Sequence, residues 1–364
     1  MNIVEIQLDN YPKTIIEAVI SSSKDSYINI DKIKSNKYII KVKNQKYGIF
    51  NWDEIFSKEK IIDRSNDFLL LKIYIQNSTL NCTYEDSNGI ILKSENLSFS
   101  KSKYLYFLNN SYNFNKKIIN LNFDKIDKYF ENYIENFNKI IDFNFIISYK
   151  PDLLILEINN YLLKLPFQLI SNYFATNKIL SLFSVNPEKQ DRLNSIKIIL
   201  NENIKISDIL FLKEAEFEIE EKLWSSLRIN KIIFEDSQQF LNCLQQSKII
   251  TLFAHGYRKK DFSSIKIGKY FFNPFSLIDC QPNVQVLLLL SCMIDYYKSE
   301  NNLLYNLFKK DIKLILSSPF ILPLEYVENI FNIIINKNYN NLYELLLSIL
   351  SSSVYTASLL RIFI

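Results

Sequence analysis

The second two thirds of the chain alternate short, nearly continuous apolar runs with longer amphipathic stretches. Continuous apolar runs are typical of parallel strands, because such strands are buried on both faces of a sheet. We predict strands at 153–158, 196–200, 229–235, 249–254, 284–290 and 312–317. Between them, the spacing predicts helices at 165–173, 215–227, 237–246 and 325–335. This alternation indicates an α/β fold, with a mostly parallel sheet and helices on both faces.

The first part of the chain has a different pattern. Short β-type runs at 38–42, 68–76, 79–84 and 89–93 are separated by polar turns and follow a short helix at 14–21. We predict a smaller, mainly-β domain over residues 1–118 that docks a partner or regulator. A long amphipathic helix at 123–141 then opens the second domain, residues 119–364.

The apolar stretch at 342–364 is the nearest approach to a membrane span. It carries Glu344, Arg361 and a run of three serines. These polar positions favour a packed amphipathic helix over a span.

Composition excludes several classes of function. The 364 residues carry a net charge of +4, with 48% hydrophobic residues, and the two signs of charge are interspersed. The chain contains no block of like charges of the kind that would indicate nucleic-acid binding. Only four glycines and one histidine occur, so a phosphate-binding loop and a zinc site are both excluded, and we expect no metal or cofactor. The four scattered cysteines form no disulfide framework and no signal peptide is evident, so we expect a cytoplasmic protein.

The single histidine and one cysteine end two of the apolar runs. His255 ends the run at 249–254, and Cys292 ends the run at 284–290. If these runs are neighbouring parallel strands, imidazole and thiol emerge at the same carboxyl edge of the sheet, where open α/β sheets place their sites. A histidine that takes the thiol proton makes the sulfur a nucleophile at neutral pH. We therefore predict a His255–Cys292 catalytic dyad.

Backbone and charged groups beside the pair suggest further roles. The N–H groups of Gly256 and Cys292 are the natural donors for an oxyanion hole. A rare glycine next to the only histidine indicates a positive φ or the close approach of a ligand. Asp295 is a candidate for binding a basic substrate side chain, and Arg258 for binding an acidic one.

The chain resembles the CHAT domain, a caspase-like cysteine peptidase domain. Besides His255-Gly256 and Ser291-Cys292, the resemblance rests on several segments that occur in the family's order: Leu153-Leu154-Ile155-Leu156, Leu165-Pro166-Phe167, Glu214-Ala215-Glu216-Phe217-Glu218, Phe262 to Gly268, and Ile315-Leu316-Ser317-Ser318. It covers roughly residues 120 to 364. It implies an endopeptidase that cuts a specific partner protein, released by a sensor or regulatory protein in a bacterial antiviral defence system.

The sequence departs from the family pattern at two places. The alanine that usually precedes the cysteine and the glycine that follows it are missing around Cys292, and Ser318-Pro319-Phe320 stands where the family has a tryptophan. A catalytically inactive caspase-like scaffold for protein interaction is therefore the alternative. A third hypothesis is a different thiol or serine hydrolase that uses His255, although the chain has no Gly-x-Ser-x-Gly motif to support a serine hydrolase.

Overall fold

The computed structural model of the protein describes residues 2–7, 28–34, 37–42, 68–76, 79–102, 104–106, 109, 126–159, 162, 165, 167–185, 190–227, 230–259, 262–336, 339–352 and 359–364. Two compact units divide the chain, Met1–Ser65 and Asn66–Ile364. In its described part, the first unit is an antiparallel sheet with the order β1-β3-β2: β1 (Asn2–Gln7), β2 (Ile28–Lys34) and β3 (Lys37–Val42). The helix expected at 14–21 lies outside the described residues.

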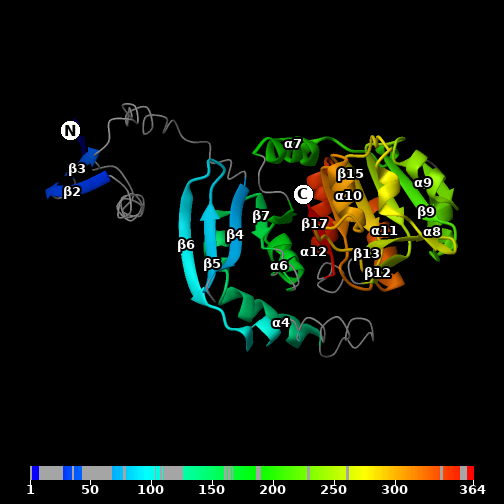
Figure 1. Ribbon diagram of the computed structural model, residues 1–364, viewed down its shortest axis with the longest axis horizontal. Coiled ribbons are helices and arrows are strands. Elements are labelled where there is room, and N and C mark those ends of the chain that lie inside the picture. The colour runs from blue at the N-terminus through cyan, green and yellow to red at the C-terminus, as the bar shows by residue number, and fades with distance from the viewer. Residues whose placement is uncertain are drawn as a thin grey trace. The chain divides into compact units, whose positions relative to one another are not determined.

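Within the described residues, the second unit is built on an 11-stranded sheet (Figure 1). Its order is β10-β9-β11-β15-β16-β17-β8-β7-β4-β5-β6. In chain order the strands are β4 (Phe68–Gln76), β5 (Thr79–Glu85), β6 (Ile91–Ser98), β7 (Leu153–Ile158), β8 (Leu180–Ser184), β9 (Ile209–Glu214), β10 (Lys231–Phe234), β11 (Ile249–Phe253), β15 (Val286–Leu290), β16 (Leu314–Ser317) and β17 (Arg361–Phe363). Neighbouring strands are parallel except for β16-β17, β4-β5 and β5-β6. The expected α/β architecture with a mostly parallel sheet is confirmed.

Helices cover both faces of this sheet. The described helices are α4 (Ile126–Asn138), α5 (Phe143–Tyr149), α6 (Gln168–Thr176), α7 (Gln190–Asn201), α8 (Glu221–Ser226), α9 (Ser237–Cys243), α10 (Leu303–Lys309), α11 (Leu324–Asn336) and α12 (Leu342–Ser351). Phe211 on β9 packs against Phe331 of α11, and Phe234 on β10 packs against Phe240 of α9. Phe234 is the register partner of Glu214, three residues beyond Phe211, so the two phenylalanines point to opposite faces.

Strands β4, β5 and β6 belong to the main sheet. The sequence places them in an amino-terminal domain that ends at residue 118, whereas the compact units divide at Ser65. Strand β4 pairs in parallel with β7, from Phe68 opposite Leu153 to Ile73 opposite Ile158. The sequence pattern could not reveal this pairing, because β7 lies far downstream in the chain. The turns between β4, β5 and β6 are also typical of a separate antiparallel sheet.

The strand expected at 196–200 is wrong, because these residues lie in helix α7. Ile196, Ile199 and Leu200 are buried, whereas Ile198 is 71% exposed. Burial at positions i, i+3 and i+4 is the helical period, which a short run of apolar residues conceals.

The helix expected at 215–227 is confirmed only over α8, because residues 215–216 form a turn and residues 217–220 have no regular structure. Tertiary contacts explain the difference. The Glu216 carboxylate pairs with Lys266 at 2.7 Å, and the Phe217 ring packs against the imidazole of His255.

Strand β17 joins the two halves of the sheet. It pairs with β16 antiparallel, from Ile315 opposite Phe363 to Ser317 opposite Arg361. On its other side, the Ile364 N–H donates to the Phe183 carbonyl at 2.9 Å. The single helix expected at 342–364 is therefore only correct for α12, since the chain later returns as a strand.

We expect Phe363→Ala to destabilise the second unit by about 3–5 kcal/mol, because truncating a buried phenylalanine leaves a cavity. The Phe363 side chain is fully buried, and its ring lies 6.0 Å from that of Phe183 and 6.2 Å from that of Tyr296. The matched control is Phe275→Ala, because Phe275 is 40% exposed. Urea unfolding followed by tryptophan fluorescence measures both; equal midpoints for the two variants would contradict the central position of β17.

Candidate active site

Two neighbouring strands bring the candidate catalytic pair to one edge of the sheet. Strands β11 and β15 are parallel and end together, with Phe253 opposite Leu290. His255 and Cys292 each follow the last strand residue by two positions. Both residues therefore emerge at the carboxyl edge, as the positions of the two apolar runs predict.

Gly256 lies directly against the backbone of Cys292. A Cβ at Gly256 would be 1.6 Å from the Cys292 carbonyl oxygen, 2.7 Å from its carbonyl carbon and 2.7 Å from the Ser291 Oγ. No side chain fits there, so glycine is required by close approach, not by a positive φ. The sequence suggested a positive φ or the close approach of a ligand, but the group that approaches Gly256 is the peptide carbonyl of Cys292.

The imidazole of His255 is exposed and rests on an aromatic ring. Its ring centroid is 5.1 Å from that of Phe217, which also lies 6.3 Å from the Phe253 ring. Phe253 in turn packs against Phe331 of α11. His255 therefore lies on the α11 side of the sheet, and its carbonyl is fixed by the Lys266 N–H at 2.7 Å.

The turn after Cys292 is anchored to the end of β16. Met293 has a φ of 57°, the left-handed region that non-glycine residues seldom adopt. Its N–H donates to the Phe320 carbonyl at 2.8 Å, and the Ile294 N–H donates to the Ser318 carbonyl at 2.8 Å. The Ser318-Pro319-Phe320 segment thus holds the candidate nucleophile in place.

The thiol of Cys292 is hydrogen-bonded to the backbone of Leu322, just before α11. The Leu322 N–H donates to Sγ at 3.2 Å, and the thiol donates to the Leu322 carbonyl at 3.5 Å. Burial raises the pKa of the Cys292 thiol, and the hydrogen bond from Leu322 opposes that rise. Among the described residues, no hydrogen bond joins Cys292 to His255. In this arrangement the thiol is protonated at neutral pH.

The Gly256 N–H points toward an open strand edge. Gly256 begins a small antiparallel sheet made of β12 (Gly256–Lys259), β13 (Phe262–Ile267) and β14 (Tyr270–Phe271). Gly256 is opposite Ile265, and the flanking bond runs from the Lys266 N–H to the His255 carbonyl. This makes Gly256 and Ile265 a non-hydrogen-bonded pair, whose own N–H groups face away from each other. The Gly256 N–H is therefore directed away from β13.

Asp295 and Arg258, the two candidates for substrate binding, contact each other. The Arg258 Nη1 lies 3.8 Å from the Asp295 Oδ2. Asp295 also accepts a hydrogen bond at 3.2 Å from Arg361, whose side chain is 2% exposed. The sequence did not identify Arg361 or Leu322 as residues of the site. Arg361 had a signal, as a lone arginine in an apolar segment, but the Leu322 contact is made by backbone atoms that any residue supplies.

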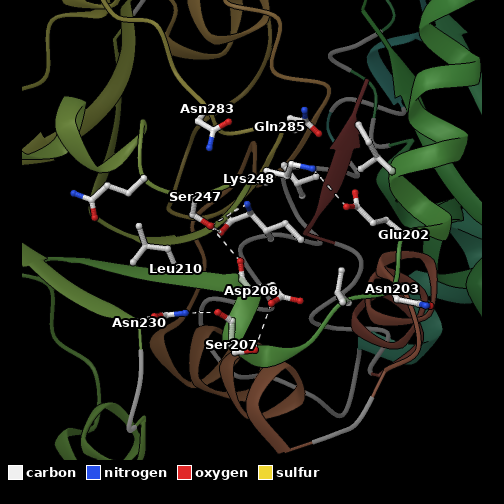
Figure 2. Close-up of a pocket in the computed structure, with 15 residues that line it drawn as sticks. Glu202, Asn203, Ser207, Asp208, Leu210, Asn230, Ser247, Lys248, Asn283 and Gln285 are labelled. Atoms are coloured by element: carbon white, nitrogen blue, oxygen red, sulfur yellow. Dashed lines mark hydrogen bonds and ion pairs between the residues drawn. The ribbon is translucent and has the colours of Figure 1, made fainter.

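A separate cavity of about 520 Å³ lies at the opposite edge of the sheet (Figure 2). It is lined by residues at the amino ends of β9, β11 and β15, among them Asp208, Lys248 and Gln285. Lys248 pairs with Glu202 at 3.6 Å. A five-residue strand spans roughly 17 Å, so the cavity does not adjoin His255 and Cys292.

Other kinds of site find no support in the described part of the chain. It contains no group of three or more side chains suited to hold a metal ion. None of its helices combines the length and the apolar character that crossing a membrane requires. No protein-family model matches the chain, and no curated protein matches its sequence.

We expect Gly256→Ala to destabilise the protein by more than about 3 kcal/mol, because the new methyl group overlaps backbone atoms of Cys292 that cannot rotate away. Gly89→Ala is the control: nothing lies within 4 Å of its added Cβ, and its φ of +76° alone costs about 1–2 kcal/mol. Thermal unfolding measures both. A Gly256→Ala protein that melts like the wild type would show that the two segments are not in contact.

We expect iodoacetamide to alkylate Cys292 in the folded protein at least ~10-fold more slowly at about pH 8 than in the urea-unfolded chain. Only the thiolate reacts, and a raised pKa lowers its fraction, so the rate should still climb above about pH 9. Peptide mass spectrometry separates Cys292 from Cys82, whose pKa burial raises to about 12 and which should react more slowly still. A rate for Cys292 that levels off near pH 7 would contradict the resting arrangement.

Proposed function

We propose that the protein is a cysteine endopeptidase in which His255 is the general base and Cys292 the nucleophile. The observation that carries the proposal is the contact of Gly256 with the Cys292 backbone, which makes the two catalytic candidates neighbours. Cys292 is also the only described cysteine that is not buried. Partial exposure and a histidine nearby are features of reactive thiols.

The chemistry follows from these groups. His255 takes the thiol proton, and the sulfur attacks the carbonyl carbon of the scissile peptide. The N–H groups of Gly256 and Cys292 stabilise the oxyanion of the tetrahedral intermediate. The C–N bond then breaks, and the amine leaves with the proton from His255. Water, activated by the same imidazole, cleaves the thioester and restores the thiol.

In this proposal, the conformation in which the Cys292 thiol contacts Leu322 is the resting state of the enzyme. The thiol is bonded to Leu322 and not to His255, so catalysis requires Sγ to move away from the segment that precedes α11. Substrate or a regulatory partner supplies the energy of that change. Gly256, next to the histidine, touches the Cys292 backbone, so the movement that brings thiol and imidazole together would be local.

The resemblance to CHAT domains supports the wider setting. A large, mostly parallel sheet with histidine and cysteine at its carboxyl edge agrees with a caspase-like architecture. The substrate is then a specific partner protein, and the amino-terminal region binds a sensor or regulator. The setting that the resemblance favours is antiviral defence in a bacterial cytoplasm.

A second candidate function is an inactive scaffold for protein interaction. The raised pKa of Cys292 and its bonds to Leu322 favour this alternative. The two functions differ in one respect: only the endopeptidase needs the thiol to leave Leu322.

Peptide-library cleavage, read by mass spectrometry of the new termini, distinguishes the two. We expect cleavage by the wild type, and a loss of at least ~100-fold in Cys292→Ala and in His255→Ala. Cys280→Ala is the matched control, because that cysteine is buried and its thiol contacts the Leu241 carbonyl in α9; peptide cleavage by this variant should be unchanged. An equal loss of cleavage in Cys280→Ala would show that Cys292 is the wrong nucleophile. Cleavage that survives in Cys292→Ala would refute the dyad.

A further inference from the structure

Arg258 occupies a defined position beside the candidate nucleophile. The Gly256 Cβ position points at the Cys292 carbonyl, and side chains two residues apart on a strand share a face. Arg258, two residues further along β12, therefore faces the segment that follows Cys292. Its ion-pair contact with Asp295 confirms this direction. The guanidinium thus lies beside the segment that follows the candidate nucleophile.

The carboxylate of Asp295 is already engaged from inside the protein. Arg361 Nη1 donates to Oδ1 at 3.2 Å and to Oδ2 at 3.5 Å, and the Tyr296 N–H donates to Oδ1 at 2.9 Å. The Asp295 side chain is only 11% exposed. Arg361 also donates to the Leu165 carbonyl at 2.9 Å, so it is fixed in place. A basic substrate side chain would have to displace this buried partner.

Arg258, by contrast, has free hydrogen-bonding capacity. Its side chain is 34% exposed, its contact with Asp295 is long at 3.8 Å, and its guanidinium lies 5.5 Å from the centre of the Tyr297 ring. The described residues supply it with no hydrogen bond, although a guanidinium carries five N–H donors. A planar fork of unused donors at a half-open position fits a carboxylate in bidentate geometry.

The charges around Asp295 do not balance. Among the described residues, two guanidinium groups, those of Arg258 and Arg361, contact one carboxylate, so this set carries one positive charge in excess. Burial lowers the pKa of Arg361, Asp295 raises it, and the charge of Arg258 lowers it further. On Arg361, the attraction to Asp295 therefore outweighs the repulsion from Arg258, whereas the charge of Arg258 itself is offset only by its long contact with Asp295. A second negative charge would balance the cluster, and a third positive charge would worsen the imbalance.

We propose that Arg258 binds the carboxylate of an aspartate or glutamate side chain, on the substrate residue that supplies the scissile carbonyl. The inference rests on the proposed endopeptidase function and deepens it. Strand geometry places Arg258 about 7 Å beyond Gly256, a distance that an arginine and an acidic side chain span together. Asp295 is the internal partner that holds Arg258, and it does not select substrate.

The test compares three tripeptidyl chloromethyl ketones that differ only in the last side chain, which is aspartate, lysine or leucine. The sulfur of Cys292 displaces chloride from the chloromethyl carbon and loses its proton, leaving a thioether that intact-mass spectrometry counts. We expect the aspartyl ketone to label Cys292 about 10- to 100-fold faster than the lysyl ketone. Iodoacetamide, measured in parallel, reports access to the thiol without side-chain recognition.

Arg258→Gln should remove the preference for aspartate, while Arg258→Lys should keep part of it. The matched control is Lys259→Gln, which removes an exposed charge from the opposite face of β12 and should leave the preference intact. Circular dichroism checks that each variant is folded. If Arg258→Gln does not fold, Arg258→Lys still tests the role of the guanidinium.

Each outcome decides the inference. Equal labelling by the three ketones, faster labelling by the lysyl ketone, or no labelling while iodoacetamide reacts would overturn it. If library cleavage depends on Cys292 but labelling ignores the acidic side chain, only the role of Arg258 fails. If labelling favours aspartate while no cleavage occurs, the acidic subsite stands and the endopeptidase function fails.

Discussion

The site depends on a backbone contact that leaves no room for a single methyl group. Where Gly256 meets the carbonyl of Cys292, the segments that leave β11 and β15 are locked together. A close-packed interior transmits such a constraint to everything built on it. The direction of β12, the position of the imidazole and the path of the chain after the cysteine all follow from it. A glycine-poor sequence has kept glycine where no substitute fits.

Around that contact, different parts of the chain hold the cysteine from different sides. The end of β16 binds the turn at Met293, the segment before α11 binds the sulfur, and Arg361 reaches Asp295 from β17. Most of these bonds are made by backbone groups. The arrangement can therefore persist while the side chains of the segment at 318–322 vary, which is consistent with the departure of this segment from the pattern of the family that the chain resembles.

Much of this fold could be predicted from sequence, but only where the local pattern is unambiguous. Strands β7, β11 and β15 are continuous apolar runs, and their ends located His255 and Cys292 correctly. The run in α7 has the same composition, and burial of every third or fourth residue became visible only in three dimensions. Long-range pairing was out of reach, because neither β4 nor β17 carries a local mark of its partner. For the same reason, Arg258 and Asp295 were candidates whose contact with each other could not be foreseen.

The position of β17 has a consequence for how the protein is made. This strand is the last of the sheet in chain order, yet it lies in the middle of the sheet, between β16 and β8. During synthesis from the amino terminus, the two halves of the sheet remain unjoined until residues 361–363 have left the ribosome. Contacts of such high sequence separation form late and slowly. Asp295 acquires its buried arginine only at that step, so a nascent chain that is missing only these residues has an incomplete site.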